Sequence, residues 1–361
     1  MRRRFLTALV VVVALASVVV SMALDTPRSN QRPMKTLSAV ARSDVRCDRY
    51  AAPWGSDRSR GTVKRPFRTA QRLADSLRPG KTGCLRGGLY DETDEGFVLR
   101  LDHGGTDGRR LTIRSFPGER AKLVGIVYIV PGANYITLSH LSIEGTGDHN
   151  TVKIYATDTV VRNNDITNAS RGESCMILGS DSDGQAVRTT VRQNRFHDCG
   201  STSNENKDHA IYVANAVDGR IVDNVFWGTS GYSIQLYPDA VGMRVSRNMI
   251  DGGPPSVRGG VILAGDSSHA SSDNVIEFNV IAYADTYNIT SGWDGSRVGT
   301  GNVVRSNCVW QGKDGNINSS NGGFTASSNT AAPPRFVSRA RHDYRLKPGS
   351  RCRRVIGLGR R

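Results

Sequence analysis

The sequence predicts an all-β protein, a single-stranded right-handed parallel β-helix (a solenoid) with a short N-terminal capping helix. Three observations predict this fold: a repeated strand pattern that contains asparagine, a second set of short aliphatic strands between the repeats, and almost no helical periodicity after Pro79. About 310 residues follow residue 46, and this length is large for one compact domain. A solenoid escapes that limit because each coil buries its face against its neighbours.

The first repeat has the pattern Val/Ile-x-x-Asn-x-Ile/Val/Phe, with successive asparagines 30, 30, 24, 31 and 28 residues apart. An asparagine at each bend can turn inward and satisfy backbone groups where the chain leaves the sheet. We therefore interpret the series as structural rather than catalytic. The competing repeat fold, a β-propeller, has longer blades and an aromatic signature that is missing here. The asparagines are Asn164, Asn194, Asn224, Asn248, Asn279 and Asn307, and residues 136–143 fit the same frame with His140 at the asparagine position.

The second set of strands alternates with the first and supplies the other faces of each coil. The strands are short and β-branched or aliphatic, and Gly, Asn, Asp or Ser residues separate them. They are Val152–Ile154, Met176–Leu178, Ile211–Val213, Ile234–Leu236 and Val261–Leu263.

Residues 1–23 have the features of a secretory signal peptide. Arg2, Arg3 and Arg4 precede an apolar run that ends at the small residues of Ser21-Met22-Ala23. We expect cleavage there, a secreted protein and no membrane span afterwards, although the run is long enough for an uncleaved anchor to be the alternative. Residues 24–46 are polar and aperiodic, which is typical of a flexible linker.

The β-helix domain is predicted to span residues 47–361, with caps at both ends because open sheet edges invite unwanted pairing. The N-terminal cap covers residues 47–90 and includes apolar residues at helical spacing over residues 67–77, stopped by Pro79 and Gly80. The C-terminal cap and tail cover residues 335–361.

Six cysteines behind a signal peptide predict disulfides, although the sequence cannot fix the pairing. Pairing in nearest-neighbour order would fasten the start, the middle and the end of the domain. The alternative is buried free thiols, and zinc-type spacing is absent. The nearest-neighbour pairs are Cys47–Cys84, Cys175–Cys199 and Cys308–Cys352.

The net charge of +15 is concentrated at the C-terminus. Residues 335–361 hold nine arginines, one lysine and one acid, a local charge of +9. Such a tail can bind anionic glycans or lipid surfaces, or it can be a solvated charged end. Nucleic acid is not expected as a partner, because no nucleic-acid-binding module is recognisable.

Several segments resemble secreted β-helix proteins of the pectate-lyase-like superfamily, over roughly residues 47–357. The N-terminal segments are Trp54-Gly-Ser-Asp57, Gly61-Thr62, Pro66-Phe67-Arg-Thr69, Leu77-Arg-Pro-Gly80 and Gly87-Gly-Leu-Tyr90; the middle ones are Asn194 to Gly200, His209-Ala-Ile-Tyr212 and Ile234 to Asp239. The resemblance is specific for the fold, and its members include lyases, hydrolases, epimerases and proteins without a known reaction. The Arg-x-Pro-x-x-Arg pattern of pectate lyases, the polygalacturonase acid set and the Asp-Pro-His-Asp motif of alginate epimerases are all absent.

In lyases of this superfamily, a base removes the proton next to a uronate carboxylate that calcium or another cation neutralises. The resemblance implies that such a site lies on the outer face of one sheet and on its flanking turns. If the aliphatic residues of the second strands point inward, then Lys153, Tyr155, Tyr212, Gln235 and Tyr237 form an outward row.

The candidate catalytic residues are Lys207 as base, His209 and Tyr212 assisting it, and Arg258 as a carboxylate clamp. Each has a plain alternative: a solvated lysine, a buried histidine, a ladder aromatic and a surface arginine. The candidate substrate-binding residues are Lys153, Gln235, Tyr237 and Trp293. Asp208, Asp239 and Asp266 could hold Ca²⁺, or they could be ordinary turn residues.

Two main functions follow, both with an extracellular or cell-wall polysaccharide as partner and a monomer as the expected state. The first is an enzyme that cleaves an anionic polysaccharide by β-elimination. The second is a non-catalytic surface or matrix rod that binds glycans. A glycoside hydrolase on the same fold is a third, with Asp208 and Asp239 as its carboxylate pair.

Overall fold

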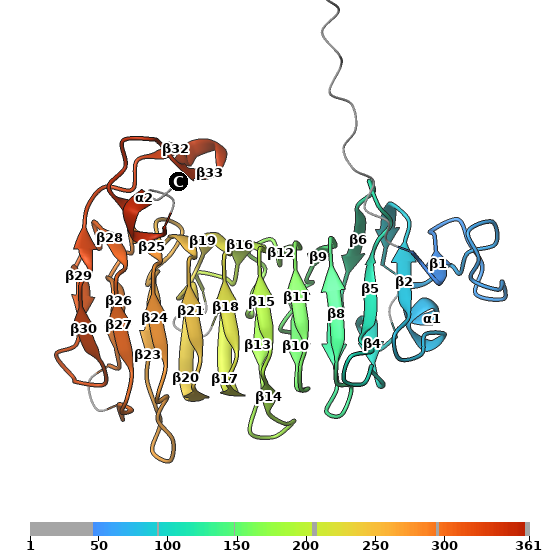
Figure 1. Cartoon of the computed structure of the whole chain (residues 1–361), viewed down its shortest axis with the longest axis horizontal. Helices are drawn as coiled ribbons and strands as arrows, with labels where there is room; N and C mark the ends of the chain where they lie inside the picture. The colour runs from blue at the N-terminus through green and yellow to red at the C-terminus, as the bar shows by residue number, and fades with distance from the viewer. Residues whose placement is uncertain (1–45, 92–93, 148, 204–207, 294–295, 358–361) are drawn as a thin grey trace, which may run out of the picture. The chain divides into compact units, whose positions relative to one another are not determined.

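The computed structural model describes residues 46–91, 94–147, 149–203, 208–293 and 296–357. These residues form a right-handed parallel β-helix, in which each coil contributes one strand to each of three parallel sheets, here called A, B and C (Figure 1). The fold predicted from the repeat is therefore confirmed. Among the described residues no helix is long and apolar enough to cross a membrane.

Sheet A contains β1 (Arg49–Ala51), β2 (Thr82–Leu85), β5 (Leu111–Ser115), β8 (Ile136–Ser139), β11 (Val160–Arg162), β15 (Thr190–Arg192), β18 (Arg220–Val222), β21 (Arg244–Ser246), β24 (Val275–Glu277), β27 (Val303–Arg305) and β30 (Thr325–Ser327). Sheet B contains β3 (Gly88–Tyr90), β6 (Ala121–Val124), β9 (Ser142–Glu144), β12 (Asp165–Thr167), β16 (Arg195–Cys199), β19 (Val225–Thr229), β22 (Met249–Asp251), β25 (Val280–Ala282), β28 (Cys308–Trp310) and β31 (Thr330–Ala331). Sheet C contains β4 (Phe97–Leu101), β7 (Ile126–Ile129), β10 (Val152–Ile154), β13 (Met176–Leu178), β17 (Ile211–Val217), β20 (Ile234–Val241), β23 (Val261–Leu263), β26 (Tyr287–Ser291) and β29 (Gly315–Asn318), with β14 (Ala186–Val187) paired to β17.

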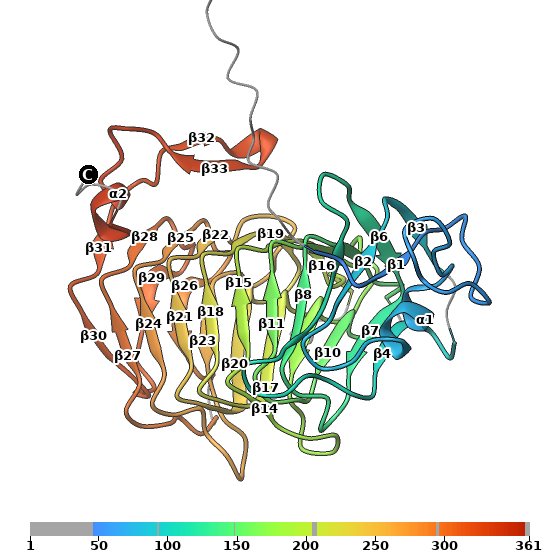
Figure 2. The same ribbon diagram turned by 45° about the vertical axis from the view of Figure 1, so that its right-hand side comes forward.

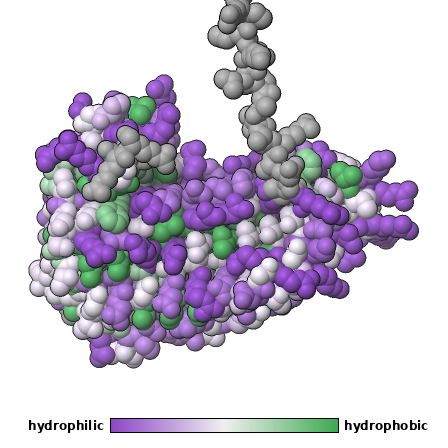
Figure 3. All heavy atoms as spheres, in the orientation of Figure 1, coloured by the Kyte–Doolittle hydropathy of each residue, from purple (hydrophilic) through white to green (hydrophobic). Residues whose placement is uncertain are grey.

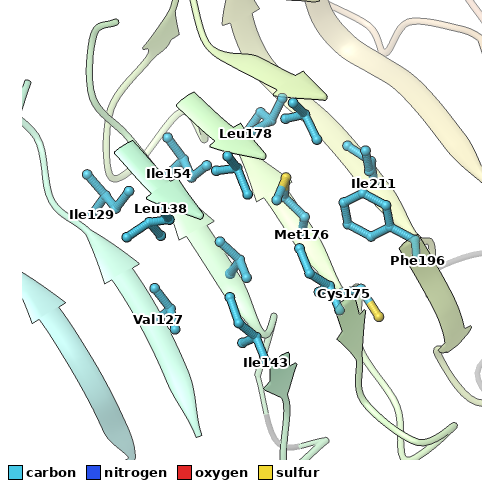
Figure 4. Close-up of a cluster of buried hydrophobic side chains, with 14 of the residues drawn as sticks. Val127, Ile129, Leu138, Ile143, Ile154, Cys175, Met176, Leu178, Phe196 and Ile211 are labelled. Atoms are coloured by element: carbon cyan, nitrogen blue, oxygen red, sulfur yellow. The ribbon is translucent and has the colours of Figure 1, made fainter. Parts of the chain in front are cut away.

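The core consists of alternate strand residues that point between the three sheets. Ile154 of sheet C, Leu138 of sheet A and Ile143 of sheet B are each completely buried, and Figure 4 shows such side chains turned toward one another. The same residue type recurs from coil to coil, as in Phe196 and Phe226, whose rings stack at 5.1 Å. Each coil therefore buries its apolar face on the next, as the period-2 pattern predicted.

The predicted asparagine ladder lies at the bend from sheet A to sheet B. The Oδ1 atom of Asn224 accepts hydrogen bonds from the backbone N–H (2.9 Å) and from the Nδ2 (3.1 Å) of Asn194. The Nδ2 of Asn224 in turn donates to the carbonyl oxygen of Val191 at 2.9 Å. The ladder continues to Asn329, beyond the predicted series.

The prediction for His140 is wrong by one residue. Sheet A pairs Leu138 with Val161, which places Leu141 opposite Asn164. The N–H of Leu141 donates to Asn164 Oδ1 at 2.9 Å, so the ladder ends here on a leucine. His140 instead occupies the left-handed position that precedes the ladder residue, with φ 61°.

A second, shorter asparagine ladder lies at the bend from sheet C to sheet A and was not predicted. Asn274 Oδ1 accepts the backbone N–H of Met243 at 2.8 Å. Asn302 Oδ1 accepts both the backbone N–H and the Nδ2 of Asn274 at 2.9 Å. It was missed because these asparagines precede their strands, outside the recognised pattern.

The nearest-neighbour disulfide pairing is confirmed at all three places, and the bonded pairs are Cys47–Cys84, Cys175–Cys199 and Cys308–Cys352. The predicted N-terminal helix is present as α1 (Ala70–Asp75). Thr69 caps it by accepting the Arg72 N–H at 3.0 Å, and Leu73 is buried in the core of the first coils.

The C-terminal segment packs on the outer face of sheet B. It contains β32 (Phe336–Ser338), the 3₁₀ turn η1 (Arg339–Arg341), β33 (Asp343–Leu346) and α2 (Cys352–Val355), and β32 and β33 form an antiparallel hairpin. Figure 2 shows this hairpin beside the edge of the solenoid where β19, β22 and β25 lie. Arg339 forms a two-point ion pair with Asp251 of β22 at 2.6 and 2.7 Å. Part of the basic tail charge therefore holds the segment in place.

Candidate functional site

The outer face of sheet C carries the residues predicted for the site. Strand register aligns Lys153, Ile177, Tyr212 and Gln235 on four successive strands, which brings three of the five residues of the predicted row together and inserts Ile177 among them. Gln235 is only 6% exposed, so its amide is largely covered. Lys153 places its Nζ 5.3 Å from the ring centre of Tyr128, toward the N-terminal coils.

Tyr155 does not belong to the exposed row. Its side chain is 3% exposed and packs with Ile177 and Ala214. Gly184, in the turn that follows β13, approaches Tyr155 Cβ. The strand pattern does not include such turns. The alternation of strand residues therefore predicted the correct side of sheet C for Tyr155, but the wrong exposure of its side chain.

Three aromatic residues form a continuous row that ends in a pocket. The rings of Tyr212 and Tyr237 stack at 6.5 Å with an angle of 17° between their planes. Tyr237 in turn contacts Trp293, with ring centres 5.2 Å apart. Trp293 is 45% exposed, which is unusual for a large apolar side chain in this domain.

The pocket has a volume of about 630 Å³ and lies where the strands of sheet C end. Two turns build its wall, because Gly265 pairs with both Ala270 and Arg297 through short bridges. Tyr237, Trp293 and Asp266 were predicted from the sequence, whereas Arg297 was not. The lining residues are Tyr237, Gly265, Asp266, Ser267, Trp293, Ser296 and Arg297.

The charged groups of the pocket are fixed by local hydrogen bonds. Asp266 Oδ1 accepts the backbone N–H groups of Ser268 and His269, both at 2.7 Å. These bonds lower the pKa of Asp266, which is therefore ionised at neutral pH. Burial, followed by the nearby Tyr237, Asp181 and Asp266, raises the pKa of Tyr212 to about 12. Tyr212 thus remains a proton donor at neutral pH.

His209 lies at the opposite end of the strands, at the start of β17. It is 1% exposed, and its Nδ1 accepts the backbone N–H of Tyr232 at 3.1 Å. Its ring centre is 5.8 Å from that of Tyr212. This environment fits the alternative of a buried, hydrogen-bonded histidine that supports Tyr212 better than a solvent-facing base.

The three aspartates predicted to hold Ca²⁺ do not come together. Asp208 is 1% exposed before β17 and accepts the N–H of Ser201 at 2.8 Å, whereas Asp239 and Asp266 lie at the other ends of their strands. Within the described residues, no group of three or more His, Cys, Asp or Glu side chains could hold a metal ion. The residues described therefore do not fit a calcium site.

Asp208 and Asp239, the carboxylate pair predicted for a glycoside hydrolase, also lie at opposite ends of their strands. Asp239 aligns with Asn215, which lies seven residues beyond Asp208 along β17. At about 3.3 Å per residue, seven residues span on the order of 20 Å, which is too far for a glycosidase pair. The carboxylates of Asp208 and Asp239 therefore do not face one another across one sugar ring.

The other predicted residues stand apart from the pocket. Arg258 lies in the turn before β23, at the end of the strands away from Asp266, and its carbonyl oxygen accepts the Thr286 N–H at 3.2 Å. Its side chain does not line the pocket. Lys207 lies outside the described residues, directly before Asp208 in the chain.

The fold and the aromatic row on sheet C define the class: a right-handed parallel β-helix with aromatic residues on the outer face of one sheet. Among solved structures, the chain is similar to pectate lyase Pel9A (TM-score 0.61, 14% identity, covering 85% of this chain and 91% of that one). It is also similar to an alginate lyase from Paenibacillus sp. str. FPU-7 (TM-score 0.55, 15% identity, 72% and 91%). At this identity the likeness shows the fold alone.

No protein-family model matches the chain. A stretch of 76 residues, 21% of this chain, is 37% identical to the uncharacterized protein YwoF of Bacillus subtilis (strain 168). The match covers 15% of that relative's length.

Proposed function

We propose that this is a secreted protein that binds an extended polysaccharide along the outer face of sheet C. The observation that carries the proposal is the contact of Tyr237 with the exposed Trp293, in a pocket with Asp266 and Arg297. Aromatic faces stack on sugar rings, and the charged groups can bind hydroxyls and carboxylates. Two neighbours with the same fold, a pectate lyase and an alginate lyase, support a polysaccharide ligand.

Secretion is supported by the disulfides and by the sequence of residues 1–23. Three disulfides among the described residues are typical of an oxidising compartment. The polar face in Figure 3, on which hydrophobic residues lie in scattered patches, agrees with a protein that works in water.

The finer proposal is that the bound polymer is a uronate and that it is cleaved by β-elimination. A base takes the proton from the carbon next to the carboxylate, and the bond from the adjacent carbon to the glycosidic oxygen breaks. A double bond forms between these two carbons, and the leaving oxygen takes up a proton. Lys207 is proposed as the base, and the protonated phenol of Tyr212 as the donor to the leaving oxygen. Arg258, which lies at the same end of the strands as Asp208, would pair with the carboxylate.

Two assays on the purified protein test these proposals separately. Binding is measured by affinity electrophoresis against pectate, alginate, hyaluronan and heparin-type glycans. Cleavage is measured as the rise in ultraviolet absorbance that an unsaturated product causes. Binding to one polymer with a rise in absorbance that disappears in a folded Lys207→Ala variant supports the lyase; binding without a rise supports the glycan-binding rod. Absence of binding across the panel overturns the proposal.

A further inference from the structure

The outer face of sheet A carries three arginines in one row on the N-terminal coils. Strand register aligns Arg114 of β5 with Ser139 of β8, then with Arg162 of β11 and Arg192 of β15. Adjacent strands lie about 4.8 Å apart, so Arg162 and Arg192 are direct neighbours. Strand β8, which carries Ser139, separates Arg114 from Arg162. The sequence analysis placed no function on this face.

These arginines have no carboxylate partner among the described residues. The side chain of Arg114 is 8% exposed and donates through Nε only to the carbonyl oxygen of Ser115, at 3.0 Å. Burial, followed by the charge of Arg162, lowers the pKa of Arg114. Burial, followed by the charge of Arg192, lowers the pKa of Arg162. Three like charges therefore share a partly desolvated face.

Two buried polar atoms beside the row also lack a partner. Ser139 is fully buried between Arg114 and Arg162 in the row, and its Oγ has no hydrogen-bond partner within the described part of the chain. The Nδ1 of the next residue, His140, is likewise buried and unpartnered there. Burial, followed by the neighbouring arginine charges, lowers the pKa of His140 to about 4, so its ring is neutral at pH 7. Both atoms are therefore available to hydrogen-bond a bound anion or water beside the arginines.

The C-terminal half of the same row shows how the chain balances this charge elsewhere. The row runs on from Arg192 through Val222 and Ser246 to Glu277 and Arg305. Glu277 is fully buried, contacts Arg244 and accepts the Arg305 Nε at 2.9 Å. Here the protein supplies its own anion to two arginines; the N-terminal half has the arginines without the anion.

We propose that the row of Arg114, Ser139, Arg162 and Arg192 binds an oxyanion: a carboxylate, sulfate or phosphate group. Guanidinium groups bind such anions through paired, charge-assisted hydrogen bonds, and the Ser139 hydroxyl adds a donor. The site lies on sheet A, whereas the proposed polysaccharide site lies on sheet C. The inference therefore stands whether or not sheet C binds a glycan.

The test compares the wild-type protein with Arg162→Gln, and uses Arg305→Gln as the matched control. The control removes the same charge from the same row, where Glu277 already serves the guanidinium. Thermal unfolding is followed in sodium sulfate and in sodium chloride of equal ionic strength. Because sulfate stabilises proteins generally by exclusion from their surface, the readout is the difference between variants. We expect sulfate to raise the melting temperature of the wild type and of Arg305→Gln more than that of Arg162→Gln. An equal gain in all three overturns the proposal.

Titration calorimetry then identifies the source of the anion. Inorganic phosphate, an oligogalacturonide and a sulfated glycan fragment are each titrated into the wild type and both variants. We expect Arg162→Gln to bind the preferred anion at least about tenfold more weakly, while Arg305→Gln binds as the wild type does. Tighter binding of one fragment than of phosphate assigns the site to that polymer; equal binding assigns it to the free ion. Binding of every probe unchanged in Arg162→Gln contradicts the assignment.

Discussion

Asn248 Oδ1 accepts two hydrogen bonds from Asn224 on the preceding coil, one from the backbone N–H at 2.9 Å and one from Nδ2 at 3.0 Å. Each ladder residue therefore directs its oxygen toward the preceding coil, while its Nδ2 donates to both neighbouring coils, as Asn248 does to Ile221 and Asn279. Because all of these atoms are buried, removing one side chain leaves donors and acceptors on both sides without a partner.

We expect Asn224→Ala to lower the free energy of unfolding by about 3 kcal/mol, through the unsatisfied groups that it creates. The comparison variant is Asn329→Ala, at the last rung, where the side chain is only half-buried and receives bonds from one coil. Urea denaturation measures both. Equal losses would show that the ladder does not act through burial.

The Asp165–His197–Asp198 cluster makes stability depend on pH. Burial lowers the pKa of His197, but its hydrogen bonds to Asp165 and Asp198, both 2.7 Å, outweigh this and the pKa is raised overall. A group whose pKa is higher in the folded state contributes its full stabilisation at pH values below its unfolded-state pKa, which is about 6.5 for histidine. This contribution is lost as the pH rises through the folded-state pKa.

Wild-type thermal stability should therefore fall, relative to His197→Gln, as the pH rises from below about 6.5 through the folded-state pKa. Melting curves of the two proteins across this range measure the difference. His103→Gln serves as control, since this half-buried histidine contacts only the Leu77 carbonyl oxygen at 3.2 Å in the described residues. A constant difference between wild type and His197→Gln at every pH would contradict the cluster's role.

Glu277→Gln should destabilise the protein by leaving Arg244 and Arg305 without their shared anion. We expect about 2 kcal/mol, below the value for fully buried pairs, because both guanidinium groups are about half exposed. Asp343→Asn breaks the ion pair with the highly exposed Arg345 and should change little. Denaturant midpoints check both, and similar losses from the two variants would contradict the assigned burial effect.

The sequence predicted the features that repeat and missed those that depend on turns. The period of the Asn164 series and the alternation around Ile154 were enough for the coils, the ladder and the side of each sheet. Exposure was different: Tyr155 and Tyr237 directly follow the aligned residues Ile154 and Leu236, yet a turn covers the first and leaves the second in a pocket. Such coverage depends on turn conformation, which strand periodicity does not carry.

Some residues that were predicted to lie together are apart, because strand periodicity does not show at which end of a strand a residue lies. Asp208 and Asp239 are close in coil number but lie at different ends of sheet C, so they never meet. The packing of Arg339 on Asp251, 88 residues earlier, had no local signal at all. The sequence could show which residues a coil contains, but not which turns fold over them.

The central claim is that Tyr237 and Trp293 form the stacking surface for a polysaccharide. Isothermal titration with oligosaccharides of the polymer that binds the wild type tests it most directly, using Trp293→Ala and, as control, Trp54→Ala. Trp54 is 66% exposed and lies in the N-terminal segment, outside the pocket. Loss of a stacking partner should weaken binding roughly tenfold in Trp293→Ala, while Trp54→Ala binds as the wild type does. Unchanged binding in a folded Trp293→Ala protein would contradict the claim.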